Sequence, residues 1–233
     1  MRSRFVRGMY HGIPIALGYL SVSFGFGIMA VRAGLTPLAA TLISASNLTS
    51  AGQAAGVDII AASGAIIEMI LVQLTINIRY SLMALSLSQK LDKKFSTPHR
   101  FAASFGITDE IFAVCSAQIE PLTPAYMYGM ILVAFLGWVS GTALGAAAGQ
   151  LLPAAVSSAL GIVLYGMFLA IIIPPSRKQK SVLIVVLAAA AVSILFRYVI
   201  TVVSGGFAVI ISAVIASAVG ALLFPVKDEE AEE

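Results

Sequence analysis

The 233-residue sequence contains little charge: 11% of its residues are Asp, Glu, Lys or Arg, and 59% are hydrophobic. A soluble domain carries roughly a quarter charged residues and about half apolar ones, so this chain cannot cover a water-facing surface with polar groups. The same composition excludes a disordered protein. The 14 Lys and Arg form no basic stripe, which argues against nucleic-acid binding. The composition therefore predicts an integral membrane protein that lies almost wholly in the bilayer.

Two further absences limit the chemistry of the chain. It has one cysteine, Cys115, which excludes an internal disulfide framework and a cysteine-based zinc site. It also has no metal-ligand cluster, no nucleotide-phosphate loop and no nucleophile elbow. We therefore expect no enzyme activity, no ATP hydrolysis, no bound metal and no cofactor.

What the sequence does contain is a series of apolar segments, each near the ~20 residues needed to cross ~30 Å of hydrocarbon. The segments are 10–31, 37–60, 63–88, 99–119, 124–149, 153–174, 181–203 and 205–224. This pattern predicts an all-α polytopic membrane protein with six to eight hydrophobic helical segments.

The distribution of basic residues indicates that one early segment does not cross. An N-terminus on the cytoplasmic side would place the basic loop 89–100 outside if every segment crossed, against the positive-inside rule. Segment 37–60 begins with Pro37 and has a polar centre, and broken backbone at membrane depth is tolerated where it lines a protein-enclosed cavity. We therefore predict that 37–60 is a re-entrant pair of half-helices.

The same charge argument at Arg177 and Lys178 leaves two alternatives for 153–174, a second re-entrant element or a crossing. If it is re-entrant, residues 1–120 and 121–233 form two repeats of opposite orientation, as in many transporters. Both termini would then be cytoplasmic, including the acidic tail 227–233.

The number of helical residues between each polar stretch and the nearest membrane surface places three polar stretches at the bilayer midplane, which is ~15 Å from either surface. At 1.5 Å per helical residue, Arg79 lies about 16 Å from Lys90, and Asp109 lies about 14 Å from Arg100. The tip of the re-entrant segment lies about 15 Å past Pro37. Such a group of residues can hold a zwitterion, because an arginine or a helix N-terminus binds a carboxylate and an acid binds an ammonium group.

These residues form the predicted site. The predicted substrate-binding residues are Asn47, Ser50, Gln53, Asn77, Arg79, Asp109 and Glu110. A low-dielectric medium favours the neutral form of an acid, so the proton-coupling candidates are Asp109, Glu110 and Glu68. Glu68 lies one turn inside its helix, where a snorkelling or partner-facing role fits equally well. The structural alternative is an ion pair between Arg79 and Asp109 or Glu110. Trp138 and the glycines at four-residue spacing that follow Gly137 are typical of helix packing.

Several motifs of the chain resemble the AzlC family, the large subunit of the AzlC/AzlD-type branched-chain amino-acid exporters. These motifs are Ala33-Gly34-Leu35-Thr36-Pro37, Ser50-Ala51-Gly52-Gln53, Asn77-Ile78-Arg79-Tyr80, Thr108-Asp109-Glu110 and Trp138-x-x-Gly141-Thr142. The resemblance implies export of leucine, isoleucine, valine or similar apolar amino acids, driven by an ion gradient. It also implies a small multi-span AzlD-type partner and a place in a bacterial cytoplasmic membrane. Departures from the family pattern at Ser50, Ala54 and Ile162 leave the exact substrate open.

Two other functions are compatible with the sequence. A passive channel of aquaporin-like plan also has six crossings and two half-helices, but a charged pair at the midplane would obstruct a pore for neutral solutes. A structural or assembly factor for another membrane protein is the third possibility. The expected partners also include membrane lipid but no nucleic acid, and assembly into a higher oligomer is left open.

Overall fold

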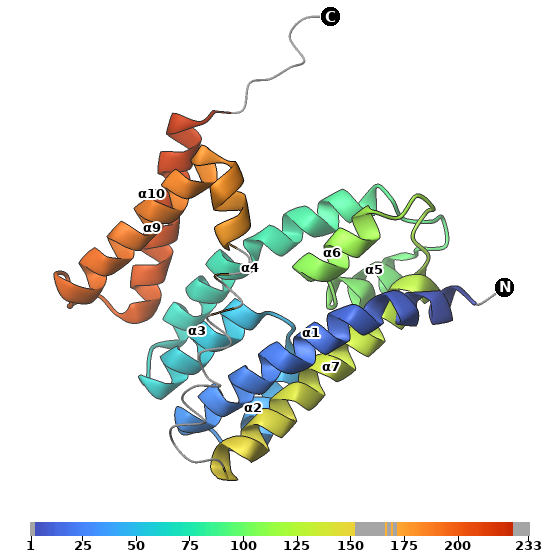
Figure 1. Cartoon of the computed structure of the whole chain (residues 1–233), viewed down its shortest axis with the longest axis horizontal. Helices are drawn as coiled ribbons and strands as arrows, with labels where there is room; N and C mark the ends of the chain where they lie inside the picture. The colour runs from blue at the N-terminus through green and yellow to red at the C-terminus, as the bar shows by residue number, and fades with distance from the viewer. Residues whose placement is uncertain (1–2, 152–165, 167–168, 170–171, 226–233) are drawn as a thin grey trace, which may run out of the picture.

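The computed structural model describes residues 3–151, 166, 169 and 172–225. The predicted all-α polytopic fold is confirmed (Figure 1). Within these residues, five helices, α1, α4, α7, α9 and α10, are long and apolar enough to cross a membrane. In chain order the helices are α1 (Arg4–Arg32), α2 (Pro37–Ser46), α3 (Ser50–Ala61), α4 (Ile66–Ser88), α5 (Thr97–Ser104), α6 (Asp109–Ser116), α7 (Pro124–Leu151), α9 (Lys180–Tyr198) and α10 (Gly205–Leu223).

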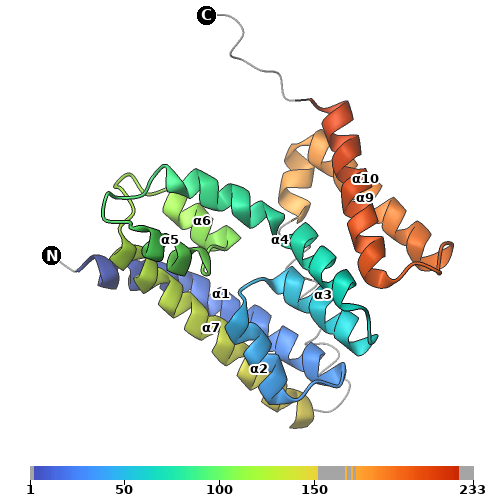
Figure 2. The ribbon, with the colours of Figure 1, turned by 180° about the vertical axis from the view of Figure 1, so that it is seen from behind.

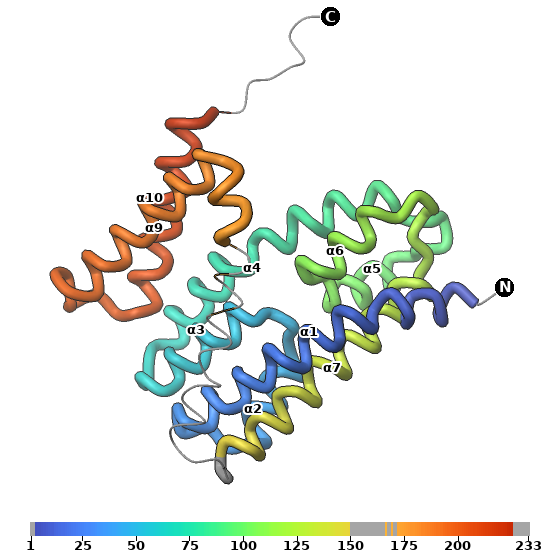
Figure 3. The backbone as a smooth tube through the Cα atoms, viewed as in Figure 1, coloured from blue at the N-terminus to red at the C-terminus, as the bar shows by residue number. Residues whose placement is uncertain are grey.

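The scaffold of the fold is the parallel pair α1 and α7, which lie side by side along their whole length (Figures 1 and 3). Glycines on both helices let the two backbones approach closely. A Cβ atom at Gly12 would lie 2.8 Å from the carbonyl oxygen of Met130, and one at Gly137 would lie 2.5 Å from that of Ala16. Small residues at four-residue spacing permit such contact between membrane helices. The predicted packing role of Gly137 and the glycines after it is thus confirmed.

Segment 37–60 contains the predicted break. Gly34, with φ of +95°, ends the turn after α1, and the Thr36 side chain accepts a hydrogen bond from Ala39 N–H at 3.1 Å to begin α2. The backbone is extended at Asn47 and Thr49, and Thr49 Oγ1 accepts from Gly52 N–H at 3.2 Å to begin α3. Helices α2 and α3 therefore form a broken hairpin.

The predicted span over 99–119 is wrong, because no continuous helix covers these residues. Helices α5 and α6 have eight residues each. Gly106 lies where a Cβ would come 2.5 Å from Ile131 Cγ2, and the Thr108 side chain accepts from Ile111 N–H at 3.4 Å, which starts a new helix at Asp109. A glycine followed by an N-cap threonine thus breaks the segment into a second hairpin.

The two hairpins enter from opposite ends of the α1–α7 scaffold. The α2–α3 hairpin joins the C-terminal end of α1 to the start of α4. The open end of α5–α6 lies at the other end, where Glu120 accepts hydrogen bonds from Arg4 at 2.6 Å and Arg7 at 3.0 Å. Figure 2 shows the two tips facing each other near the middle of the molecule, and residues of both tips line one cavity.

Helices α9 and α10 pack against each other, and α10 also packs on α4 (Figure 1). The predicted segment 153–174 lies largely outside the described residues, as does the tail 227–233. Both described breaks fall within residues 1–120, so the division into repeats at 1–120 and 121–233 stays a prediction.

Candidate functional site

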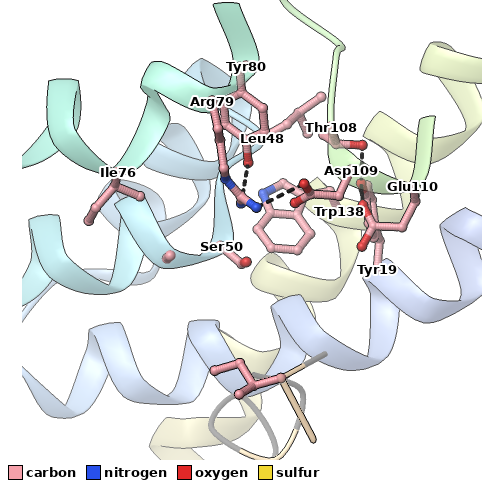
Figure 4. A pocket seen from close by; sticks show the side chains of 12 residues that line it. Tyr19, Leu48, Ser50, Ile76, Arg79, Tyr80, Thr108, Asp109, Glu110 and Trp138 are labelled. Carbon is pink, nitrogen blue, oxygen red and sulfur yellow. Dashed lines mark hydrogen bonds and ion pairs between the residues drawn. The ribbon is translucent and has the colours of Figure 1, made fainter. Parts of the chain in front are cut away.

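A cavity of about 260 Å³, here called the central pocket, lies where the two hairpin tips meet α4 and the α1–α7 scaffold (Figure 4). It combines charged and hydroxyl groups with an apolar wall. Its lining residues are Tyr19, Leu48, Ser50, Ala51, Ile76, Arg79, Tyr80, Thr108, Asp109, Glu110, Trp138 and Ile172.

The first turns of two half-helices line this pocket. Ser50 and Ala51 begin α3, and Asp109 and Glu110 begin α6. The N-terminal end of a helix carries a partial positive charge and unpaired N–H groups, so both ends favour negative charge in the pocket. At α6 this charge is already supplied by its own two acids, whereas the first turn of α3 contains no acid.

The charged centre of the pocket is the pair Arg79 and Asp109. Arg79 Nη1 donates to Asp109 Oδ1 at 2.8 Å, and the side chains are 45% and 37% exposed. The Arg79 guanidinium also lies 5.0 Å from the centre of the Tyr80 ring. The pair links α4 to the tip of the second hairpin through one hydrogen bond only. Arg79 Nη2 also donates to the Tyr80 hydroxyl at 3.3 Å, and both Arg79 and Asp109 line the pocket (Figure 4).

Glu110 is held from the scaffold by Tyr19. The Tyr19 hydroxyl donates to Glu110 Oε2 at 2.6 Å and lies 2.5 Å from Thr108 Oγ1. The Tyr19 ring packs edge-on against the Trp138 ring, with centroids 5.2 Å apart. Trp138 is 2% exposed, and its Nε1–H has no hydrogen-bond partner among the described residues. A buried donor beside a polar cavity is available for an acceptor group of a ligand.

The structure places four of the predicted substrate-binding residues in the central pocket: Ser50, Arg79, Asp109 and Glu110. Asn47 and Asn77 line a smaller adjoining cavity. Gln53 does not line the central pocket and is 2% exposed. Its Nε2 donates to Ser44 Oγ at 2.6 Å, and Ser44 in turn is 2.7 Å from Thr142 Oγ1, which fastens the first hairpin to α7.

Glu68 does not reach the central pocket. Its carboxylate is 5% exposed and accepts from Ser204 Oγ at 2.5 Å and Gly206 N–H at 2.9 Å. Glu68 thus caps the N-terminus of α10, where a negative charge is favourable. A separate cavity of about 240 Å³ lies beside it and includes Asp58. Within the described ranges, no group of three His, Cys, Asp or Glu side chains could hold a metal ion.

Sequence reasoning missed Tyr19 and gave Trp138 a packing role only. Both reach the pocket because α1 and α7 lie in contact, a relation between helices far apart in the sequence. Thr108 belongs to the Thr108-Asp109-Glu110 motif, but no sequence pattern near Tyr19 indicates that its hydroxyl contacts Thr108.

Comparison with known proteins shows that the motifs lining the pocket lie within a region shared with one protein family. Residues 14–152 match the sequence profile of the AzlC protein family, which spans α1 to α7 and so includes both hairpins and nearly all of the pocket. No solved structure matches the chain.

Individual relatives are also membrane proteins. An uncharacterized membrane protein of Archaeoglobus fulgidus is 32% identical over 172 residues, covering 73% of this chain and 75% of the relative. The inner membrane protein YgaZ of Escherichia coli is 28% identical over 176 residues, with 72% of each chain covered. An uncharacterized membrane protein of Helicobacter pylori is 26% identical over 144 residues, covering 60% of this chain and 62% of the relative. This chain belongs to the AzlC family of membrane proteins.

Proposed function

We propose that this protein is a secondary transporter that exports branched-chain or similar apolar amino acids across a bacterial cytoplasmic membrane. The observation that carries the proposal is the central pocket, in which a helix N-terminus, an arginine, two acids and an apolar wall surround one space of about 260 Å³. These are the groups that an apolar zwitterion needs, and few other small solutes need all of them.

Each part of the substrate has a matching group. The carboxylate would accept hydrogen bonds from the first turn of α3 and from Arg79, and the unpartnered Trp138 Nε1–H is a further donor. The ammonium group would bind the Glu110 carboxylate, which Tyr19 holds in place. The aliphatic side chain would contact apolar residues of the wall, including Ile76 and Ile172.

The Arg79–Asp109 pair provides a means of coupling. In the structure Arg79 donates to Asp109 at 2.8 Å. The ionised acid of this pair, like Glu110, can bind the substrate ammonium group, and a proton on the acid removes the charge that attracts this group. Substrate and proton would therefore exclude each other, which is the requirement for an exporter that exchanges outgoing substrate for an incoming proton.

The exporter would be the large subunit of a two-component system with a small AzlD-type membrane subunit, as the family resemblance implies. The N-terminus and the 89–96 loop would lie on the cytoplasmic side, since both are basic. The inner-membrane name of the Escherichia coli relative supports the same location.

Counterflow of labelled leucine in proteoliposomes that contain both subunits tests the proposal. Arg79→Ala removes the carboxylate ligand, and Asp109→Asn removes an acid for which substrate and proton compete, so both variants should abolish counterflow. Arg177→Ala, which changes an exposed arginine outside the pocket, is the matched control and should retain it. Unchanged transport in both pocket variants would show that this site is not the substrate site.

A passive channel is the second candidate, because two half-helix hairpins that meet tip to tip can also frame a pore. The tips here read Asn47-Leu48-Thr49 and Gly106-Ile107-Thr108, without the Asn-Pro-Ala sequence of aquaporins. The ion pair between α4 and the second tip would also block a neutral solute. Uphill accumulation that stops when the proton gradient is removed would distinguish the transporter from the channel.

A further inference from the structure

A second cavity, here called the tip cavity, adjoins the central pocket and has a volume of about 190 Å³. Leu48 and Tyr80 line both spaces and therefore stand between them. The tip cavity is lined by residues of both hairpin tips and of α4, namely Ser46, Asn47, Leu48, Thr49, Asn77, Tyr80, Ser104, Phe105 and Ile107.

Opposite ends of the half-helices line the two cavities. The tip cavity is lined by Ser46 and Ser104, the last residues of α2 and α5. The central pocket is lined by the first residues of α3 and α6. A helix carries a partial negative charge at its C-terminus and a partial positive charge at its N-terminus. The fold therefore favours a cation in the tip cavity and an anion in the central pocket.

Two residues that line the tip cavity carry an amide oxygen without a hydrogen-bond partner. Asn47 Oδ1 and Asn77 Oδ1 are both buried, and neither accepts a hydrogen bond from any described residue. The orientation of the Asn77 amide is fixed, because its Nδ2 donates to Gln73 O at 2.9 Å and to Gln73 Oε1 at 3.0 Å. Buried acceptors without partners are rare in proteins, and a bound cation would satisfy both.

The composition of the lining identifies the kind of cation. It contains no Lys, Arg or His, which would repel a cation, and no Asp or Glu. Sites for calcium or magnesium normally include carboxylate ligands, whereas amide, hydroxyl and main-chain oxygens at broken helices hold monovalent ions in transporters. We propose that the tip cavity is a binding site for a monovalent metal cation, Na⁺ or K⁺, with Asn47 Oδ1 and Asn77 Oδ1 among its ligands.

A cation at this place would be a second coupling ion, held beside the substrate and separated from it by Leu48 and Tyr80. It would also join the first hairpin tip to α4, because its two named ligands come from these elements, while residues of the second tip close the cavity. The role in transport rests on the proposed function, but binding of the cation does not.

The experiment measures thermal unfolding of the purified full chain in detergent, without amino acid, in sodium, potassium or choline chloride at equal ionic strength. Sodium or potassium should raise the midpoint above that in choline in a concentration-dependent manner, because a ligand bound only by the folded state stabilises it. Asn47→Ala should weaken the apparent affinity by about tenfold or more. Asn47→Asp, which keeps an oxygen in place, should retain the effect, and so should Gln89→Ala, a change in an exposed amide at the end of α4.

Three results would overturn the proposal. They are equal midpoints in the three salts, an ion-dependent shift that Asn47→Ala leaves unchanged, and a shift that arises only when an amino acid is added, which would assign the two oxygens to the substrate ammonium group. If Asn47→Ala does not fold, saturable binding of radioactive sodium or potassium to the wild-type chain decides the question, and its absence refutes the site. Arg79→Ala separates the two proposals, since it should abolish transport and keep the ion-dependent shift.

Discussion

Replacing Gly137 by alanine should force the scaffold helices apart. The added Cβ would lie 2.5 Å from the carbonyl oxygen of Ala16 and 2.8 Å from its Cα, and both are backbone atoms that cannot rotate away. To restore ordinary contact, α1 must move by about 0.9 Å from α7. Overpacking of this kind costs about 1–3 kcal/mol, which corresponds to a fall of roughly 2–12 °C in the unfolding midpoint for a chain of this size.

The chain supplies its own reporter for this measurement. Cys115 is the one cysteine in the sequence and is fully buried, so a thiol-reactive dye becomes fluorescent only as the fold opens. Gly18→Ala is the matched control, because it lies on the same scaffold and its Cβ would meet nothing within 4 Å. Since alanine favours a helix over glycine by up to about 1 kcal/mol, the control midpoint should be unchanged or higher.

The shift should also reach the pocket. Gly137 precedes Trp138, whose ring packs on Tyr19 of α1 at 5.2 Å, so separation of the helices moves both residues of the pocket wall. We therefore expect weaker substrate binding in Gly137→Ala than in Gly18→Ala. Equal midpoints for the two variants would refute the close contact between α1 and α7 on which this reasoning depends.

Three further predictions concern other parts of the molecule. Glu68→Gln should lower the same unfolding midpoint by the equivalent of about 1 kcal/mol, because it removes the charge that caps α10, and an unchanged midpoint would contradict that role. Tyr19→Phe should raise the KM for counterflow by about tenfold, because Glu110 loses a hydrogen-bond donor, and a wild-type KM would count against Glu110 as a ligand. Lys178 lies in a basic stretch with Arg177 and Lys180, which the positive-inside rule places on the cytoplasmic side, so Lys178→Cys should react only with reagents that reach that side, and labelling from outside would contradict this placement.

The sequence allowed the membrane class, the break in 37–60 and the meeting of Arg79 with Asp109 to be predicted. Each of these follows from a local property: the scarcity of charge, a run of small polar residues after Pro37, and the helical rise between a basic loop and a buried charge. The predicted depth of Asp109 rested on a continuous helix after Arg100, and this helix is broken. Asp109 still reaches Arg79, because α5 carries the chain inward before the break.

The second break escaped prediction because its local signals are weak. Glycine and threonine are both common residues within membrane helices, and only the approach of Ile131 from α7 shows why a side chain is excluded at Gly106. The hydrogen bond between Ser204 and Glu68 could not be predicted for the same reason. Ser204 follows α9, and no sequence pattern near either residue indicates that the two meet. Contacts between distant helices decide these features, and composition or periodicity does not contain them.

The pairing of α1 with α7 has a consequence for the order of assembly. Residues 33–123 lie between the two helices in the sequence, so at a synthesis rate of about 5–20 residues per second the glycine face of α1 waits roughly 5–20 s for its partner. Both hairpins, whose helices have at most 12 residues and cannot cross a bilayer alone, emerge during this interval. Since α2, α5 and α6 all pack on α7, both hairpins gain the full surface they pack against only after α7 has been synthesised.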